Sequence, residues 1–248
     1  MNHQPSTMNM APAIIFSAGL GTRFKPWTDQ HPKALAMVNG KSLLQRNIEY
    51  LQQYGITDVV VNIHHFPDQI MNAIQQNKGW GSNIIISDES NEVLETGGGL
   101  LKAKPLLENG LPFISLNVDI LTALDLNKLF SFYQQYQPLI AFAVTKRKTS
   151  RYVLLNKDNR MCGWMNSTTG EEKIVLPGYD LTPFAYSGVV IYSPEIFSKI
   201  KQTGKFSIMD TYLDLAADNV ILGFDHTGDN WVDVGRPESV IVAEELFI

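Results

Sequence analysis

Residues 12–33 read PAIIFSAGLGTRFKPWTDQHPK, a short apolar run followed at once by a glycine-rich, basic stretch. The apolar part, residues 12–18, predicts a buried strand. The glycines after it let successive backbone N–H groups turn toward one point, and such a nest binds oxygen anions. Arg23, Lys25 and Lys33 add three cations, which suits a triphosphate. A glycine-rich turn with surface lysines can also be purely structural, but the length of this string favours a functional interpretation.

The same alternation of apolar runs and helical stretches continues outward from this segment. Further strands are predicted at residues 57–63, 83–87, 112–118 and 138–145. Helices are predicted over 41–54 with Ser42 as N-cap, from Pro67 to Asn77, from the glycine run at 97–99, and over 125–136. This order is typical of repeated βαβ units. We therefore predict an α/β fold, a doubly wound, Rossmann-like and mostly parallel sheet.

The rhythm changes between Lys146 and Pro183, where turn residues and short β-like pieces dominate. A hairpin is predicted around Asp158 and Asn159, so we expect a small antiparallel β insertion over about 146–183. The rest of the chain predicts a strand at 184–192, helices near 194–200 and 207–217, a pair of strands at 219–225 and 230–234, and a closing helix from Pro237. We expect one domain over 11–248, after a flexible lead-in over 1–10.

The composition narrows the functional classes. The 248 residues are 44% hydrophobic, enough for a substantial core, and the net charge of −5 gives no general attraction to nucleic acid or to an anionic membrane. The one cysteine, Cys162, excludes an internal disulfide framework and fits a reducing compartment, so we expect a cytoplasmic protein. No Walker phosphate loop, HExxH or nucleophile-elbow serine is present, and Phe24 stands where a dinucleotide fingerprint needs its third glycine.

In open α/β sheets, ligands bind beyond the carboxyl ends of the strands, so the residues there are candidates for chemistry. After the third strand comes EVLETGGG at 92–99, whose glycines before a helix would let a flat base lie against the backbone, or would form only a flexible turn. Asp119 follows the fourth strand, which ends in Asn117 and Val118, and WVDVG at 231–235 supplies a second carboxylate, Asp233. Mg²⁺ is commonly held by such a pair, although either aspartate alone could be a helix cap or turn residue. No sequence pattern brings the two together.

Asn62 ends the second strand, and His64 and His65 follow it. Adjacent histidines point in different directions on an extended segment, and no third metal ligand is evident. We favour structural or sugar-contact roles for this pair over metal binding.

Residues 19–33 resemble the signature of the sugar-1-phosphate nucleotidyltransferases, G-x-G-T-R-[ML]-x-P-[LM]-T-x-x-x-P-K, with Phe24 and Trp27 as apolar departures. ETGGG at 95–99 and WVDVG at 231–235 are most similar to the uridylyltransferases that act on N-acetylmuramate 1-phosphate. The resemblance implies an enzyme that forms an NDP-sugar and pyrophosphate from an NTP and a sugar 1-phosphate. One departure is Val118, where many relatives carry glycine, because its branched side chain would crowd a ligand that approaches the backbone.

The resemblance also implies roles for particular residues. Catalysis would fall to Arg23, Lys33 and Asp119, and Asp119 and Asp233 would hold Mg²⁺. The nucleotide would be bound by Ala18, Gly19, Gly21, Thr22, Arg23, Lys25, Glu95, Thr96, Gly97 and Gly98. The sugar would be contacted by Asn62, Asn117, Asn166 and Gly188.

We expect UTP as the preferred NTP and an acceptor such as N-acetylmuramate 1-phosphate, with no nucleic-acid or membrane partner and a monomeric or homodimeric state. The alternatives are a GTP- or CTP-dependent enzyme acting on mannose 1-phosphate, heptose 1-phosphate or phosphocholine, or a non-catalytic module that senses sugar nucleotides.

Overall fold

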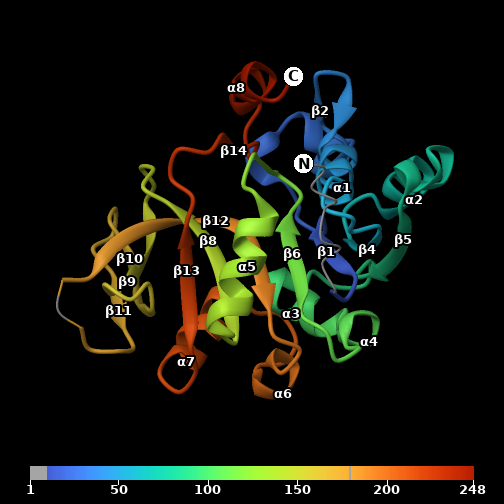
Figure 1. The fold of residues 1–248 in the computed structure, drawn as a ribbon. Helices are drawn as coiled ribbons and strands as arrows, with labels where there is room; N and C mark the ends of the chain where they lie inside the picture. Colours follow the sequence, from blue (N-terminus) through green and yellow to red (C-terminus); the bar gives the residue numbers. More distant parts are fainter. Residues whose placement is uncertain (1–9, 179) are drawn as a thin grey trace, which may run out of the picture.

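The computed structural model describes residues 10–178 and 180–248 (Figure 1). The expected lead-in over residues 1–10 lies outside them except for Met10. The central sheet has the strand order β5-β4-β1-β6-β12-β8-β13. Its strands are β1 (Ala13–Phe16), β4 (Asp58–Ile63), β5 (Asn83–Asp88), β6 (Phe113–Asn117), β8 (Ile140–Thr145), β12 (Thr182–Tyr192) and β13 (Ile221–Asp225).

The direction of the strands confirms the predicted mostly parallel sheet. β1 runs parallel to β4 and β6, and β4 runs parallel to β5. Strand β12 is antiparallel to both of its neighbours, β6 and β8, while β13 is again parallel to β8. The carboxyl ends of β1, β4, β5 and β6 therefore share one edge, which is where a ligand site is expected.

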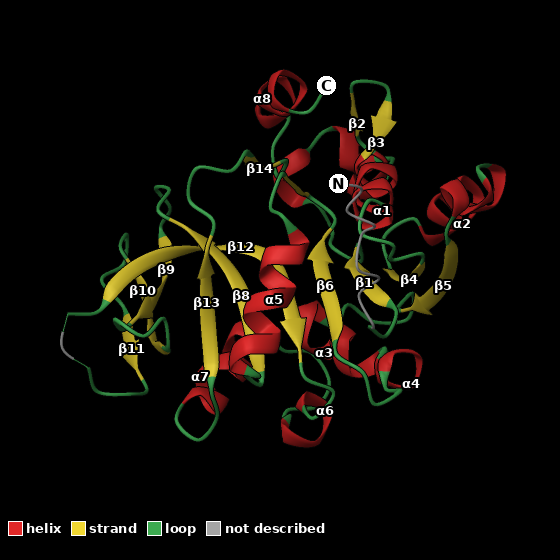
Figure 2. Cartoon of the chain, in the orientation of Figure 1, coloured by secondary structure: helices red, strands yellow, loops and turns green. Residues whose placement is uncertain are grey.

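Helices cover both faces of the sheet, as Figure 2 shows with α5 on the near face and α3 behind. Successive side chains of β1 enter opposite cores: Ala13 and Ile15 pack into one, and Ile14 and Phe16 into the other. The first core includes side chains of α1 (Leu43–Gln52), α2 (Pro67–Gln76), α5 (Leu126–Tyr136) and α8 (Glu238–Leu246). The second includes side chains of α3 (Glu95–Lys102), α4 (Lys104–Leu107), α6 (Ile196–Lys199) and α7 (Ile208–Ala216).

Local signals set the ends of several helices. The Ser42 side chain accepts a hydrogen bond from the Gln45 N–H and caps α1, as predicted. Pro67 lies in the first turn of α2, where its missing N–H costs no hydrogen bond. Among residues 10–178 and 180–248, no helix has the length and apolar character that a membrane span requires.

The predicted antiparallel insertion is present and extends the sheet sideways (Figure 1). It consists of β9 (Arg151–Leu155), β10 (Met161–Asn166) and β11 (Glu172–Ile174), and β9 pairs with the first residues of β12. An irregularity in β12 between Tyr186 and Val190 contains Gly188, whose φ is 76°. Strand β12 thus belongs to the insertion at one end and to the central sheet at the other.

Two predictions of local structure were wrong. The strands predicted at 219–225 and 230–234 do not pair with each other, because β13 joins β8 in the central sheet and β14 (Trp231–Asp233) pairs with β7 (Ile120–Thr122). The helix predicted to start in the glycine run at 97–99 starts earlier, at Glu95. The glycines therefore lie inside α3 and not in a loop before it.

Candidate active site

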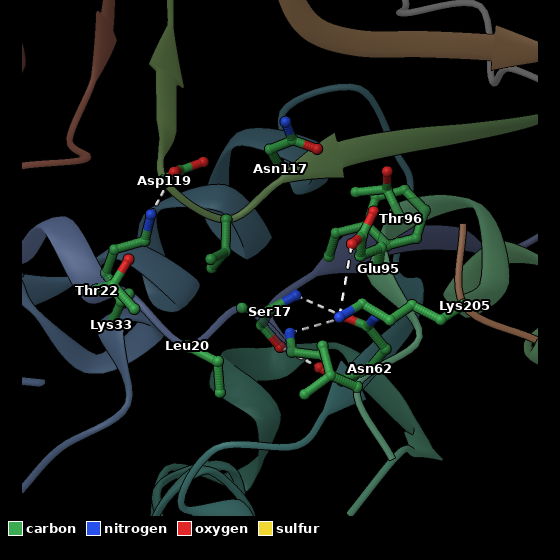
Figure 3. Close-up of a pocket in the computed structure, with 16 residues that line it drawn as sticks. Ser17, Leu20, Thr22, Lys33, Asn62, Glu95, Thr96, Asn117, Asp119 and Lys205 are labelled. Carbon is green, nitrogen blue, oxygen red and sulfur yellow. Dashed lines mark hydrogen bonds and ion pairs between the residues drawn. The ribbon is translucent and has the colours of Figure 1, made fainter. Parts of the chain in front are cut away.

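A cavity of about 400 Å³ opens at the shared carboxyl edge of the sheet (Figure 3). The register explains its position, because Phe16 at the end of β1 pairs with Asn62 on one side and Asn117 on the other. Ten of the predicted site residues line it: Ala18, Gly19, Gly21, Thr22, Lys33, Asn62, Glu95, Thr96, Asn117 and Asp119. The tertiary structure thus gathers groups from five separate segments around one space.

The loop after β1 is held in a fixed shape by its surroundings. Gly21 has φ 61°, and a Cβ there would lie 2.8 Å from the Thr28 methyl group. The Thr28 hydroxyl donates to the Gly21 carbonyl at 2.9 Å, and His65 Nε2 lies 2.9 Å from the Thr28 carbonyl oxygen. Only glycine combines this left-handed backbone with such a close neighbour. The loop is therefore preorganised, and His65 serves a structural role.

Asn62 fixes the start of the same loop. Its Oδ1 accepts hydrogen bonds from the N–H groups of Ser17 and Ala18 at 2.6 and 3.2 Å, and its Nδ2 donates to Glu89 Oε1 at 2.8 Å. With only 2% of Asn62 exposed, the amide predicted to contact a sugar is occupied by partners within the protein.

Glu89, which sequence reasoning missed, orients the Asn62 amide. Only 1% of Glu89 is exposed. Burial raises the pKa of its carboxyl, and the hydrogen bond from Asn62 opposes that rise. His64 Nδ1 lies 2.7 Å from the Glu89 backbone carbonyl oxygen, so this histidine also contacts the frame of the loop. The place of Glu89 two residues after the strand predicted at 83–87 is the sequence signal that could have pointed to it.

Two strands outside the central sheet bring the predicted metal carboxylates together. β7 directly follows Asp119, and its partner β14 ends in Asp233. The Val234 N–H donates a hydrogen bond to the Asp119 carbonyl oxygen at 2.8 Å, so the contact between the two segments continues one residue beyond Asp233. No local sequence pattern announces this pairing, because β7 and β14 are three residues long and far apart in the chain.

The charges around the two carboxylates are unevenly balanced. Lys33 forms an ion pair with Asp119, and Arg23 Nη2 lies 3.8 Å from Asp233 Oδ2. Burial and then the nearby Asp119 charge raise the pKa of Asp233, and Arg23, Lys33 and Arg147 only partly offset this. The cations around Asp233 therefore do not fully compensate its negative charge.

The donor set fits a hard divalent cation. Asp233 Oδ1 is buried and has no hydrogen-bond partner in the described structure. Over the described ranges, no group of three or more His, Cys, Asp or Glu side chains is placed to hold a metal. Mg²⁺ usually takes one or two carboxylates and completes its octahedron with substrate phosphates and water, so Asp119 and Asp233 would suffice as its protein ligands.

The remaining predicted residues lie outside the cavity wall. Lys25 is exposed and pairs with Asp29 at 2.8 Å. Gly97 and Gly98 are buried inside α3, where a Cβ on Gly98 would collide with the Gly204 carbonyl oxygen. The Asn166 side-chain oxygen accepts from the N–H groups of Thr168 and Thr169 in the turn after β10. Each of these four residues thus contacts other parts of the protein and does not line this cavity.

A second cavity of about 490 Å³ adjoins the first and shares Phe16, Thr96 and Asn117 with it. The insertion and the segment at α7 supply much of its wall, including the basic residues Arg147, Arg151 and Lys173 and the carboxylates Glu171 and Asp210. Gly188 lies close to Asn117. A Cβ on Gly188 would be 3.1 Å from Asn117 Nδ2. The two cavities are therefore neighbours, and both have cations in their walls.

Sequence reasoning missed two basic residues of this region. Arg147 lines the second cavity, and Lys205 lines the first, where its Nζ lies 3.7 Å from Glu95 Oε1 (Figure 3). Arg147 is the middle residue of the basic run Lys146–Lys148, and both Arg147 and Lys205 lie in irregular segments that match no motif.

Comparison with known proteins identifies the family. The nucleotidyl transferase family model matches residues 12–247. The chain is 31% identical to N-acetylmuramate alpha-1-phosphate uridylyltransferase of Caulobacter vibrioides over 248 residues, which cover 96% of this chain and 98% of that protein. It is 34% identical to the enzyme of the same name from Neisseria meningitidis serogroup B over 223 residues, 90% of this chain and 92% of that protein.

The fold has a close counterpart among solved structures. HddC from Yersinia pseudotuberculosis, complexed with GMP-PN, matches with a TM-score of 0.78 at 24% identity, covering 96% of this chain and 100% of that chain. The chain therefore belongs to the nucleotidyl transferase family, as the string at residues 19–33 predicted. Within that family it is a sugar-1-phosphate nucleotidyltransferase.

Proposed function

We propose that this enzyme transfers UMP from UTP to N-acetylmuramate 1-phosphate, with Mg²⁺ bound by Asp119 and Asp233. The observation that carries the proposal is the group Lys33, Asp119 and Asp233 beside two adjoining cavities. The two relatives described above, which match nearly the whole chain, are named for this reaction.

In the proposed step, an oxygen of the acceptor phosphate attacks the α-phosphorus of the NTP. The new P–O bond forms as the bond to the bridging oxygen of the β-phosphate breaks, and pyrophosphate leaves with that electron pair. The attacking phosphate is already anionic, so no general base is needed. The main barrier is then the repulsion between two polyanions that must be held in line.

The chain's own groups address that repulsion. The N–H groups of Ser17 and Ala18 are bound to Asn62, so the N–H groups of residues 19–22 would face the triphosphate, and Lys33 offers a cation beside the carboxylates. Arg23, which is half exposed next to Asp233, can reach the leaving pyrophosphate. When bound, Mg²⁺ supplies the further positive charge that the triphosphate and the growing negative charge require.

The second cavity supports an acceptor that carries more than one negative group. N-acetylmuramate has a lactyl carboxylate in addition to the 1-phosphate, and the three cations of this cavity, Arg147, Arg151 and Lys173, outnumber its two carboxylates, Glu171 and Asp210. The nucleotide would occupy the first cavity with its base near Glu95 and Thr96. We propose a cytoplasmic location, because NTP substrates are available there.

Pyrophosphate release with purified protein tests the proposal. The panel combines UTP, GTP, CTP and ATP with N-acetylmuramate 1-phosphate, N-acetylglucosamine 1-phosphate and mannose 1-phosphate, each with Mg²⁺ or with EDTA. We expect turnover to be fastest with UTP and N-acetylmuramate 1-phosphate and to stop in EDTA. Faster turnover with GTP and mannose 1-phosphate would overturn the substrate assignment. Full activity in EDTA would overturn the metal role.

A further inference from the structure

Arg147 is fixed in place at the wall of the second cavity. It follows β8 by two residues, and its guanidinium stacks over the Trp231 ring with 3.9 Å to the ring centroid. Its Nη2 donates to the Tyr186 carbonyl oxygen at 2.9 Å. The Trp231 indole is itself held by a hydrogen bond from Nε1 to the Ser187 carbonyl oxygen at 2.9 Å. The guanidinium is thus preorganised on an aromatic face.

The charge of Arg147 has no matching anion in the described structure. Burial lowers its pKa, its Nε is buried without a hydrogen-bond partner, and no carboxylate of the described residues lies within 4.0 Å of it. A partly buried cation of this kind normally has an anionic partner, because desolvation is otherwise uncompensated. The other two cations of the cavity differ: Arg151 is exposed, and Lys173 is exposed and pairs with Glu171 at 3.6 Å.

The position of Arg147 connects the acceptor cavity to the reacting centre. Trp231, which carries the guanidinium, begins strand β14, and Asp233 ends it. Arg147 and Asp233 influence each other's pKa without forming an ion pair. An anion on Arg147 would therefore lie beside the proposed metal site and within the space assigned to the acceptor.

We propose that Arg147 binds an oxyanion of the acceptor sugar phosphate and sets the affinity for that substrate. The inference rests on the proposed function, since it assigns the second cavity to the acceptor. The oxyanion is either the 1-phosphate or the lactyl carboxylate, and both fit the planar fork of a guanidinium. A lysine would keep the charge but lose the stacking and the fork.

Steady-state kinetics of Arg147→Met and Arg147→Lys test the proposal, with Lys146→Met as the control. Lys146 is the exposed neighbour and does not line either cavity. We expect Arg147→Met to raise the KM for the acceptor about 10- to 100-fold, as for a lost charge-assisted hydrogen bond, and to change the KM for UTP less than twofold. Arg147→Lys should fall between Arg147→Met and wild type, and Lys146→Met should match wild type.

Two acceptors identify the oxyanion. An equal loss with N-acetylmuramate 1-phosphate and N-acetylglucosamine 1-phosphate assigns Arg147 to the phosphate, and a loss confined to N-acetylmuramate 1-phosphate assigns it to the carboxylate. An acceptor KM within twofold of wild type with both compounds would overturn the proposal, as would an equal rise in the KM for UTP. If Arg147→Met does not fold, the acceptor KM values of Arg147→Lys decide between these outcomes.

A binding measurement separates this inference from the proposed function. Thermal unfolding is followed with and without each acceptor phosphate in Mg²⁺, independently of turnover. Stabilisation of wild type that is lost in Arg147→Met supports the inference even if UTP is not the donor. Equal stabilisation of both proteins, or of neither, would overturn it. If wild type but not Arg147→Met is stabilised and no turnover is seen, only the proposed reaction is contradicted.

Discussion

The two glycine-rich segments of this enzyme, residues 17–22 and 95–99, look alike in sequence but use their glycines in opposite ways. In the first, the backbone lies open to the cavity, and a Cβ on Gly19 would meet no atom within 4 Å. In the second, the glycines lie inside helix α3 and are buried against other segments. The absence of a Cβ serves ligand access in one place and close packing in the other.

The packed glycines of α3 accommodate neighbours from distant parts of the chain. A Cβ on Gly97 would collide with the Phe206 ring, and one on Gly99 would lie 2.7 Å from Glu89 Oε1. Through Glu89, the packed segment touches Asn62, which holds the start of the open loop. Composition alone cannot distinguish the two uses, because both give closely spaced glycines after a strand.

The largest expected effect comes from removing the cation beside the open loop. Lys33→Ala should lower the turnover number about 10²- to 10³-fold, because an electrostatic contact of this kind is worth about 3–4 kcal/mol in the transition state. The side chain is 12% exposed and pairs with Asp119, so the variant also loses a largely buried ion pair and its fold is measured alongside its turnover. Pyrophosphate release measures the turnover number, and circular dichroism measures whether the variant is folded.

Lys41→Ala is the matched control for Lys33→Ala, because Lys41 is a surface lysine that pairs with Glu49. It should retain turnover within about threefold, as expected for an exposed ion pair. Near-wild-type turnover in folded Lys33→Ala would contradict the role of the open loop in catalysis.

The next effect should fall on stability, and it tests the packed segment. Gly98→Ala places a methyl group against the Gly204 backbone, which cannot move aside as a side chain can. We expect a loss of about 1–3 kcal/mol in the free energy of unfolding. Gly19→Ala, in open space, should change stability by less than about 0.5 kcal/mol. Urea unfolding compares them, and equal losses would mean that the two segments do not differ as described.

The smallest effect concerns Glu89, which lies between the two segments. Burial raises the pKa of its carboxyl in the fold. Its ionisation therefore favours the unfolded chain, and stability is lost as pH rises from the unfolded value of about 4.3 through the folded pKa. Glu89→Gln removes this titration and can still accept the hydrogen bond from Asn62.

The melting temperature of Glu89→Gln relative to wild type should therefore rise between pH 4 and pH 8. Glu92→Gln, at an exposed carboxylate of the same segment, is the matched control. A relative melting temperature that falls with pH would show that the buried carboxylate is stabilised in its charged form.

Much of the fold was predictable because its signals are local. The apolar runs that became β1, β4 and β6 need only period and length to be recognised, and Ser42 caps α1 through its own side chain. The loop at residues 19–33 was predictable for the same reason. By contrast, the strands at 219–225 and 230–234 were assigned to each other because they are neighbours in sequence, whereas their partners are β8 and β7.

The sequence by itself determined the fold class, the strand ends that line the candidate site, and the family, because each depends on patterns within a few turns of chain. Only the tertiary structure decided which groups meet. It paired β7 with β14 so that Asp233 joins Asp119, buried the glycines of α3, and placed Arg147 on Trp231. These contacts join residues far apart in the chain, and their energies depend on burial and on neighbours that no local pattern contains.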